Sequence, residues 1–61
     1  MSKDTLILTI AGIRYVMRPK DEEMVRRGMT KQYKPSTMVT ISDKTTGRVY
    51  ETIRLDTLFN F

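Results

Sequence analysis

The chain has no cysteine and no histidine. It therefore forms no disulfide, and the sequence argues against a structural zinc site, whose ligands are mainly Cys and His. Histidine is also the general base of the common catalytic triads, so the serines have no such base to activate them. The three glycines are isolated and form no phosphate-binding loop. We expect a protein that is not an enzyme and that holds no metal and no cofactor.

Long hydrophobic runs are absent as well. No stretch approaches the roughly 18 apolar residues that span a bilayer, so we expect no membrane partner. The apolar segment 6–10 leads straight into a turn instead of a signal-peptide cleavage site. Together with the lack of cysteine, this favours a reducing, cytoplasmic location.

The length of 61 residues predicts one small basic domain that covers residues 1–61. A chain this short buries only about 60% of its unfolded surface, so its stability is marginal. Without disulfide or metal, a second copy is one way to gain stability. We therefore consider a two-fold homodimer alongside a well-packed monomer.

Charge gives the first indication of a partner. Lys and Arg number 11 and Asp and Glu number 7, which gives a net charge of +4. This excess favours an anionic partner, either nucleic acid (DNA or RNA) or an acidic protein surface. The alternative is an ordinary small protein with a few extra basic residues on its solvated surface.

The N-terminal part predicts a β-hairpin. Residues 5–10 and 13–18 are rich in β-formers, and Ala11-Gly12 between them suits a two-residue turn. This turn pairs Ile10 with Ile13, Leu8 with Tyr15 and Leu6 with Met17. Because side chains alternate along a strand, all six lie on one side of the sheet.

A short helix is predicted after this hairpin. Pro19 ends the second strand and suits a helix start. Three acidic residues then precede two arginines, which is the charge order that the helix dipole favours, and Gly28 follows as a stop. We expect a helix of about two turns with Met24 and Val25 facing the sheet, followed by a loop over residues 29–35.

The second predicted hairpin pairs residues 37–42 with 48–55. Placing Ser42 opposite Arg48 aligns Ile41 with Val49, and Thr37 with Ile53. A slip of one residue would instead place Ile41 opposite Tyr50 and mix the two faces, so we prefer the first register.

The last strand, residues 48–55, has two unlike faces. In the preferred register the apolar side chains Val49, Ile53 and Leu55 face the core. The other face is basic and aromatic and looks outward, with Arg48, Tyr50, Thr52 and Arg54.

The sequence therefore predicts an α+β fold in the order β-β-α-β-β. The strands are antiparallel and strongly curved, in one small sheet or a half-open barrel, and Asp56 caps a short C-terminal helical turn. The expected core consists of Leu6, Leu8, Ile10, Ile13, Tyr15, Met17, Met24, Val25, Val39, Ile41, Val49, Ile53 and Leu55.

Non-catalytic nucleic-acid binding is the first functional hypothesis. Cations spread over a surface neutralise phosphates, and flat rings offer stacking platforms for bases, with little base specificity expected. The candidate residues are Arg14, Arg18, Lys31, Tyr33, Lys34, Arg48, Tyr50 and Arg54. A continuous basic stripe that includes Tyr33 and Tyr50 would favour this hypothesis.

A small protein-binding inhibitor or adaptor is the alternative, of the kind that phages and mobile elements use to cover a site on a larger host protein. The same Arg and Tyr residues would be interface anchors, and an exposed sheet edge could extend a partner's sheet. Leu58, Phe59 and Phe61 near the C-terminus either close the core or contact another chain. Scattered charges around an apolar patch would favour a protein partner.

Overall fold

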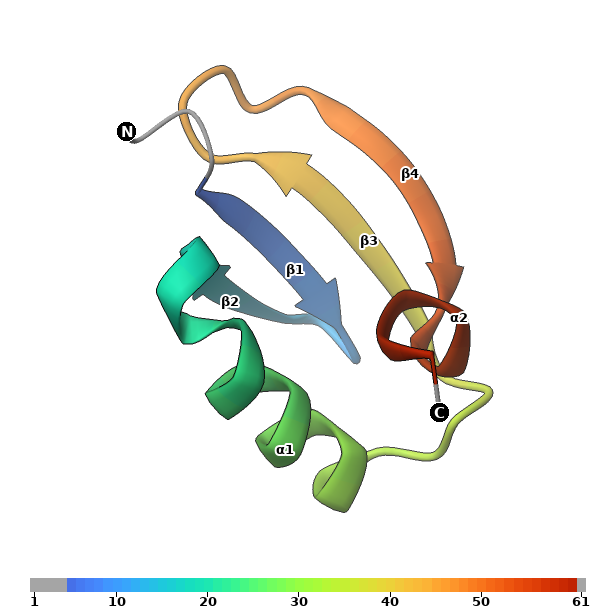
Figure 1. Ribbon diagram of the computed structural model, residues 1–61. Helices are drawn as coiled ribbons and strands as arrows, with labels where there is room; N and C mark the ends of the chain where they lie inside the picture. Colours follow the sequence, from blue (N-terminus) through green and yellow to red (C-terminus); the bar gives the residue numbers. More distant parts are fainter. Residues whose placement is uncertain (1–4, 61) are drawn as a thin grey trace.

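The computed structural model describes residues 5–60, which form an α+β fold. The elements are β1 (Leu6–Ile10), β2 (Ile13–Met17), the 3-10 helix η2 (Pro19–Asp21), α1 (Glu22–Gln32), β3 (Met38–Asp43), β4 (Val49–Arg54) and α2 (Leu55–Phe59). The four strands form one antiparallel sheet in the order β2-β1-β3-β4. Figure 1 shows β3 and β4 bending strongly, with α1 and α2 on the same side of the sheet. The predicted element order is confirmed, and the arrangement is an open sheet, not a barrel.

The predicted register of the first hairpin is confirmed. Leu6 pairs with Met17, Leu8 with Tyr15 and Ile10 with Ile13. The turn residues Ala11 and Gly12 both have positive φ, 52° and 79°, as a type I′ turn requires. The twist of this turn matches that of the flanking strands, so a two-residue connection is sufficient.

Helix α1 is longer than predicted. It runs through Gly28 to Gln32, and the backbone N–H of Tyr33 bonds to the carbonyl of Met29 at 2.9 Å. The prediction that Gly28 ends the helix is therefore wrong. The reason is tertiary: Val25 and Met29 lie one turn apart on the helix, and both pack against the core. That spacing of four is the sequence signal for the longer helix.

Three residues of the predicted core are exposed instead. Met24 is 70% exposed on α1, and Ile13 is 48% exposed beside the hairpin turn. Val49 is 58% exposed on β4. The other predicted core residues are buried or packed against the buried cluster.

The exposure of Val49 follows from a β-bulge. The observed pairs are Ser42 with Val49, Ile41 with Glu51 and Val39 with Ile53. Neither register considered from the sequence is correct, because β4 has one residue more than β3 between the first two pairs. Because of the bulge, the side chain of Val49 lies on the same face of the sheet as Ser42, away from the core.

The same bulge places Tyr50 on the helix-covered side of the sheet. Its hydroxyl donates to Oδ2 of Asp43 at 3.2 Å. Asp43 pairs with Leu6, which packs against the core, so this hydroxyl lies on the core side. The prediction that Tyr50 shares an outward face with Thr52 and Arg54 is therefore wrong.

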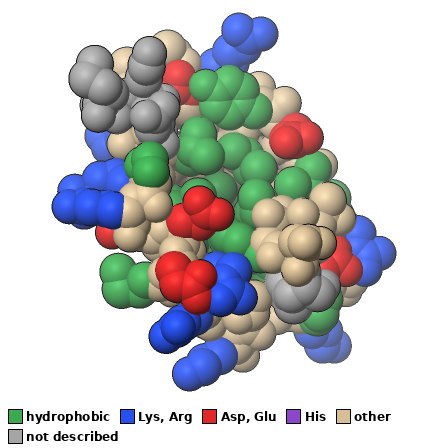
Figure 2. All heavy atoms as spheres, viewed as in Figure 1, with side chains coloured by type: hydrophobic (Ala, Val, Ile, Leu, Met, Phe, Trp, Pro, Cys, Tyr) green, Lys and Arg blue, Asp and Glu red, His purple; other side chains and the backbone are tan. Residues whose placement is uncertain are grey.

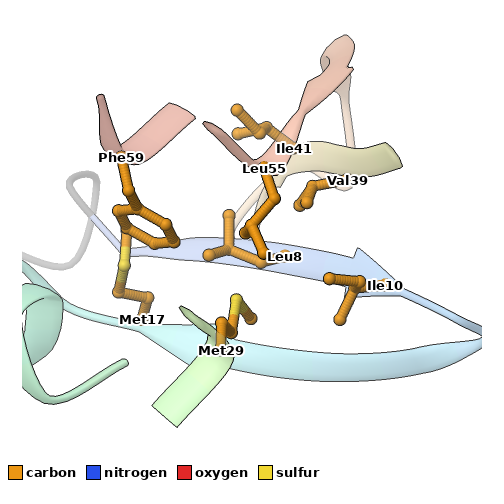
Figure 3. Close-up of a cluster of buried hydrophobic side chains, with 8 residues drawn as sticks. All are labelled: Leu8, Ile10, Met17, Met29, Val39, Ile41, Leu55 and Phe59. Carbon is orange, nitrogen blue, oxygen red and sulfur yellow. The ribbon is translucent and has the colours of Figure 1, made fainter. Parts of the chain in front are cut away.

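Figure 3 shows the buried cluster between the sheet and the two helices. Its members are Leu8, Ile10, Met17, Met29, Val39, Ile41, Leu55 and Phe59. Met29 and Phe59 belong to this core, although the sequence does not predict them there. Leu55 and Phe59 are one turn apart on α2, so both reach the core. Helix α2 begins with Arg54 at the N-cap, two residues earlier than predicted, so Asp56 lies in the first turn and is not the cap.

Candidate binding surface

Both helices cover the same face of the sheet, and we call the opposite one the open face (Figure 1). The strand register places side chains on it in rows that run across the strands. One row passes from Val16 through Ile7 and Ser42 to Val49. With strands about 4.8 Å apart, this row is about 14 Å long. We call it the apolar row.

The next row is polar and lies beside the apolar row. It passes from Arg14 through Thr9 and Thr40 to Thr52. The hydroxyls of Thr40 and Thr52 lie 3.1 Å apart and share a hydrogen bond. Threonine is common in β-strands. Two threonines that lie opposite each other on neighbouring strands stabilise the pairing of those strands.

Beyond the polar row, Met38 and Arg54 form the last pair of this face. Val16, Met38 and Val49 are each more than half exposed. Val16 and Val49 lie at the two ends of the apolar row, on the edge strands β2 and β4. Met38 lies on the inner strand β3, beside Arg54. Ile7, between Val16 and Ser42 in the apolar row, is only 7% exposed. The exposed apolar side chains therefore lie around a buried centre, and a sheet face of this composition suits a contact surface.

The predicted nucleic-acid-binding residues do not come together. Of the eight, only Arg14 and Arg54 lie on the open face, at opposite edges of the sheet. Lys31 is on α1, Lys34 follows that helix, and Arg48 lies in the turn before β4. On the helix-covered side, Figure 2 shows Lys and Arg around the rim, separated by hydrophobic and acidic side chains.

Several arginines are paired with carboxylates. Arg18 bonds to Asp21 at 2.9 Å, and Arg54 bonds to Asp56 through two nitrogens at 3.1 and 2.8 Å. These arginine hydrogen bonds hold the pKa of Asp21 and the pKa of Asp56 below their ordinary value of 3.8. Glu23 binds the two adjacent arginines of α1 in the same way. Exposed pairs of this kind add little stability, but they reduce the positive charge left for an anionic ligand.

The tyrosines are engaged on the helix-covered side. The hydroxyls of Tyr15 and Tyr33 lie 3.0 Å apart, and both rings pack against the core. The hydrogen bond to Tyr15 raises the pKa of Tyr33 above its ordinary value of 10.0. Partial burial, followed by the charge of Asp43, raises the pKa of Tyr50 in the same direction. Among residues 5–60 no aromatic ring lies on the open face, so that face offers no stacking platform for bases.

The C-terminal residues proposed as an interface have different environments. Phe59 is buried in the core of its own chain, with only 8% of its surface exposed. Leu58 is half-buried and packs against the same cluster. Phe61 lies outside the described residues. Closing the core is therefore the role that the structure gives to Phe59.

The open face was not found from the sequence, because its apolar residues depend on long-range pairing. Val16 is predicted on the outer side of the first hairpin by alternation alone. Val49 joins it only through the bulge, and Met38 precedes the buried part of β3. Alternation along β2 therefore indicates only Val16 among the three exposed apolar residues of this face.

No protein-family model, curated protein or solved structure matches this chain. Within residues 5–60, no helix is long and apolar enough to cross a membrane. The same part of the chain contains no group of three or more acidic residues placed to hold a metal ion.

Proposed function

We propose that this chain is a non-catalytic protein-binding module and that its partner is a protein that docks on the open face. The observation that supports this most directly is the exposed apolar set Val16, Met38 and Val49 on the sheet face that neither helix covers. Exposed apolar patches rimmed by polar groups mark protein–protein contacts. A chain without cysteine that binds a protein in this way suits the cytoplasm, which we propose as its location.

Charge indicates what the partner surface contains. The apolar row is bordered by the polar row, which begins with Arg14 at one edge of the sheet. Arg54 stands at the other edge, where Asp56 already pairs with it, so Arg14 contributes more of the positive charge of this face. The chain has a net charge of +4. A complementary partner therefore presents an apolar centre and carboxylates at its rim.

Size indicates how much of the molecule takes part. The open face measures about 14 Å across the strands and about 13 Å along them, so its area is near 200 Å² in projection. A stable interface buries about 800 Å² on each partner. The whole chain exposes 4382 Å². The open face is therefore the centre of the contact, and a stable complex also uses flanking surface.

Nucleic-acid binding is the competing function, supported by the net charge. Exposed cations with no carboxylate partner among the described residues are Arg14, Lys20, Lys31, Lys34, Lys44 and Arg48. They could contact phosphates, with affinity that falls steeply as salt rises. Their scatter and the absence of rings on the open face favour the protein partner.

Two matched variants separate these functions. Val49→Lys adds a positive charge at the open face, and Met24→Lys adds the same charge on α1. The immobilised proteins are exposed to nuclease-treated lysate, and captured proteins are quantified by mass spectrometry. We expect the wild type to capture a partner protein. Val49→Lys should reduce the affinity for this partner roughly tenfold, because a lysine interrupts the apolar row. Met24→Lys should capture it as the wild type does.

Oligonucleotide binding completes this test. Fluorescence anisotropy with single- and double-stranded oligonucleotides is measured over a salt series. If the competing function holds, both lysine variants bind more tightly than the wild type, and the slope against salt is steep. That result, with no nuclease-resistant partner, would remove the proposed function.

A further inference from the structure

Strand β2 is one of the two edges of the sheet, and its free backbone groups can be assigned. A two-residue I′ turn begins with a hydrogen-bonded pair, here Ile10 with Ile13. Hydrogen-bonded and non-hydrogen-bonded pairs alternate in an antiparallel ladder. Tyr15 and Met17 therefore bond to β1, whereas the N–H and C=O groups of Arg14 and Val16 point away from the sheet. The next carbonyl, that of Arg18, accepts from Asp21 N–H at 2.8 Å and ends this edge.

The other edge, β4, is less suited to pairing. Its ladder is interrupted by the bulge at Ser42 and Val49, which twists the strand. Arg48 and Arg54 flank its two ends. Bulges and charges are the devices by which proteins protect sheet edges. Strand β2 has a regular register along its whole length and no bulge.

We propose that the β2 edge receives an extended segment of the partner protein as a fifth, antiparallel strand. In this segment a carboxylate lies opposite Arg14 and a β-branched apolar residue lies opposite Val16. The inference rests on the proposed function, because it specifies how the protein partner is bound. Main-chain bonds at these two positions give the affinity, and the alternating side chains give the selectivity.

The side chains of β2 determine which residues the partner segment needs. Arg14 is exposed, and no carboxylate of the described residues pairs with it. Val16 is 51% exposed and continues the apolar row, so an apolar neighbour lengthens that row by one strand. On the other face, Tyr15 and Ile13 suit threonine or valine. The added strand also supplies the flanking area that the open face lacks.

A second copy fits this edge less well. Two β2 strands paired about a two-fold axis at Tyr15 place Arg14 of each copy opposite Val16 of the other. The residue opposite each arginine is then a valine, which does not pair with its charge. The pairing also joins two chains that each have a net charge of +4. Charge complementarity therefore favours an acidic segment of another protein.

The test uses a synthetic peptide, acetyl-Thr-Thr-Val-Thr-Glu-Val-Thr-amide, in which the first Val and the Glu fall opposite Val16 and Arg14. Backbone amide spectra of the full chain are recorded with peptide up to about 1 mM. In the free chain, the amides of Arg14 and Val16 should exchange quickly with solvent, and those of Tyr15 and Met17 slowly. With peptide, the first two should become protected.

Two control peptides and two matched protein variants define the contact. A peptide N-methylated at its first valine keeps the side chain but loses one main-chain donor, so it should not bind. A peptide with Lys in place of Glu should bind roughly tenfold more weakly. Arg14→Glu should reverse this preference, whereas Lys31→Glu, the same charge change on α1, should leave it unchanged.

Each contrary result overturns the inference. These results are no shift at β2, equal binding of the Glu and Lys peptides, binding of the N-methylated peptide, and protection of Arg14 and Val16 in a free dimer. Protection of these two amides in a free dimer would mean that a second copy of the chain pairs with the β2 edge. If the edge fails while Val49→Lys still weakens capture of the protein partner, the proposed function stands without it. If capture also fails to depend on Val49, both are overturned.

Discussion

The hydroxyl oxygens of Tyr15 and Tyr33 lie 3.0 Å apart, although 18 positions separate the two residues in the chain. Tyr15 belongs to β2, and Tyr33 caps the C-terminus of α1. Among the described residues this is the hydrogen bond between side chains that joins the helix to the sheet. Both rings pack against the core, so the bond is partly shielded from water. It fixes where the helix ends relative to the strand.

The first prediction concerns the acidity of Tyr33. Its pKa is raised above 10.0, chiefly by the hydrogen bond to Tyr15. Since the folded chain holds this proton more tightly than the unfolded chain, the resulting stability is complete below about pH 10 and is lost as the pH rises through the folded pKa. Tyr15→Phe should lower the pKa of Tyr33 toward 10.0. Titration followed by NMR of carbon-13-labelled tyrosine measures this shift.

A matched variant makes that measurement specific. Tyr50→Phe removes a hydroxyl elsewhere and should leave the pKa of Tyr33 unchanged. Tyr15→Phe should also reduce the free energy of unfolding, because the hydrogen bond between the two hydroxyls is lost. An unchanged pKa in Tyr15→Phe would mean that the two hydroxyls do not bond in solution.

The second prediction concerns Gly28, which lies inside α1 on its exposed side. A Cβ built there meets no heavy atom within 4 Å. Alanine at an unhindered helical position restricts the unfolded chain and favours the helix. Gly28→Ala should therefore raise the free energy of unfolding by about 0.5–1 kcal/mol. Gly47→Ala is the control: φ is +76° there, so this change should lower stability. Chemical denaturation measures both, and a loss of stability in Gly28→Ala would contradict the helix.

The first hairpin was predictable in full, because its turn, alternation and pairing are all local and agree with one another. The end of α1 was not, because Gly28 is a local stop signal that the burial of Met29 overrides. The bulge in β4 was not predictable either. The change of register between the pairs Ser42–Val49 and Ile41–Glu51 reveals it, and the turn between the strands allows several registers. The face predicted to bind nucleic acid combines Tyr50 with Thr52 and Arg54. In the structure the bulge places Tyr50 on the opposite side of the sheet from the other two residues.

The third prediction concerns Asp43, which organises the turn between β3 and β4. Its carboxylate accepts from Thr45 N–H at 2.9 Å and from the hydroxyls of Thr46 and Tyr50 at 3.2 Å each. The bond from Thr45 is the main cause that lowers the pKa of Asp43 below 3.8. Because the folded pKa is depressed, the stability from this carboxylate is present above about pH 3.8 and is lost as the pH falls through the folded value.

Asp43→Asn tests this pH dependence. The variant should be less stable than the wild type at neutral pH, and the difference should shrink as the pH falls below about 4. Thermal unfolding over an acid series gives both curves. The pKa of Tyr50 should also fall in this variant, because the nearby negative charge is gone. Curves that stay parallel down to the lowest pH would show that the carboxylate charge makes no contribution.

The last prediction concerns Phe59, whose ring lies in the core on the short helix α2. Phe59→Ala removes a buried ring and should cost about 3–5 kcal/mol. A 61-residue chain has a total stability of only about 3–9 kcal/mol, so this variant should melt far below the wild type or not fold. Phe59→Leu keeps most of the apolar volume and should remain folded with a smaller loss. Light scattering on Phe59→Leu and the wild type should give the same mass, because the ring packs within its own chain. A wild-type dimer that Phe59→Leu dissociates would instead show that this end of α2 also contacts a second copy.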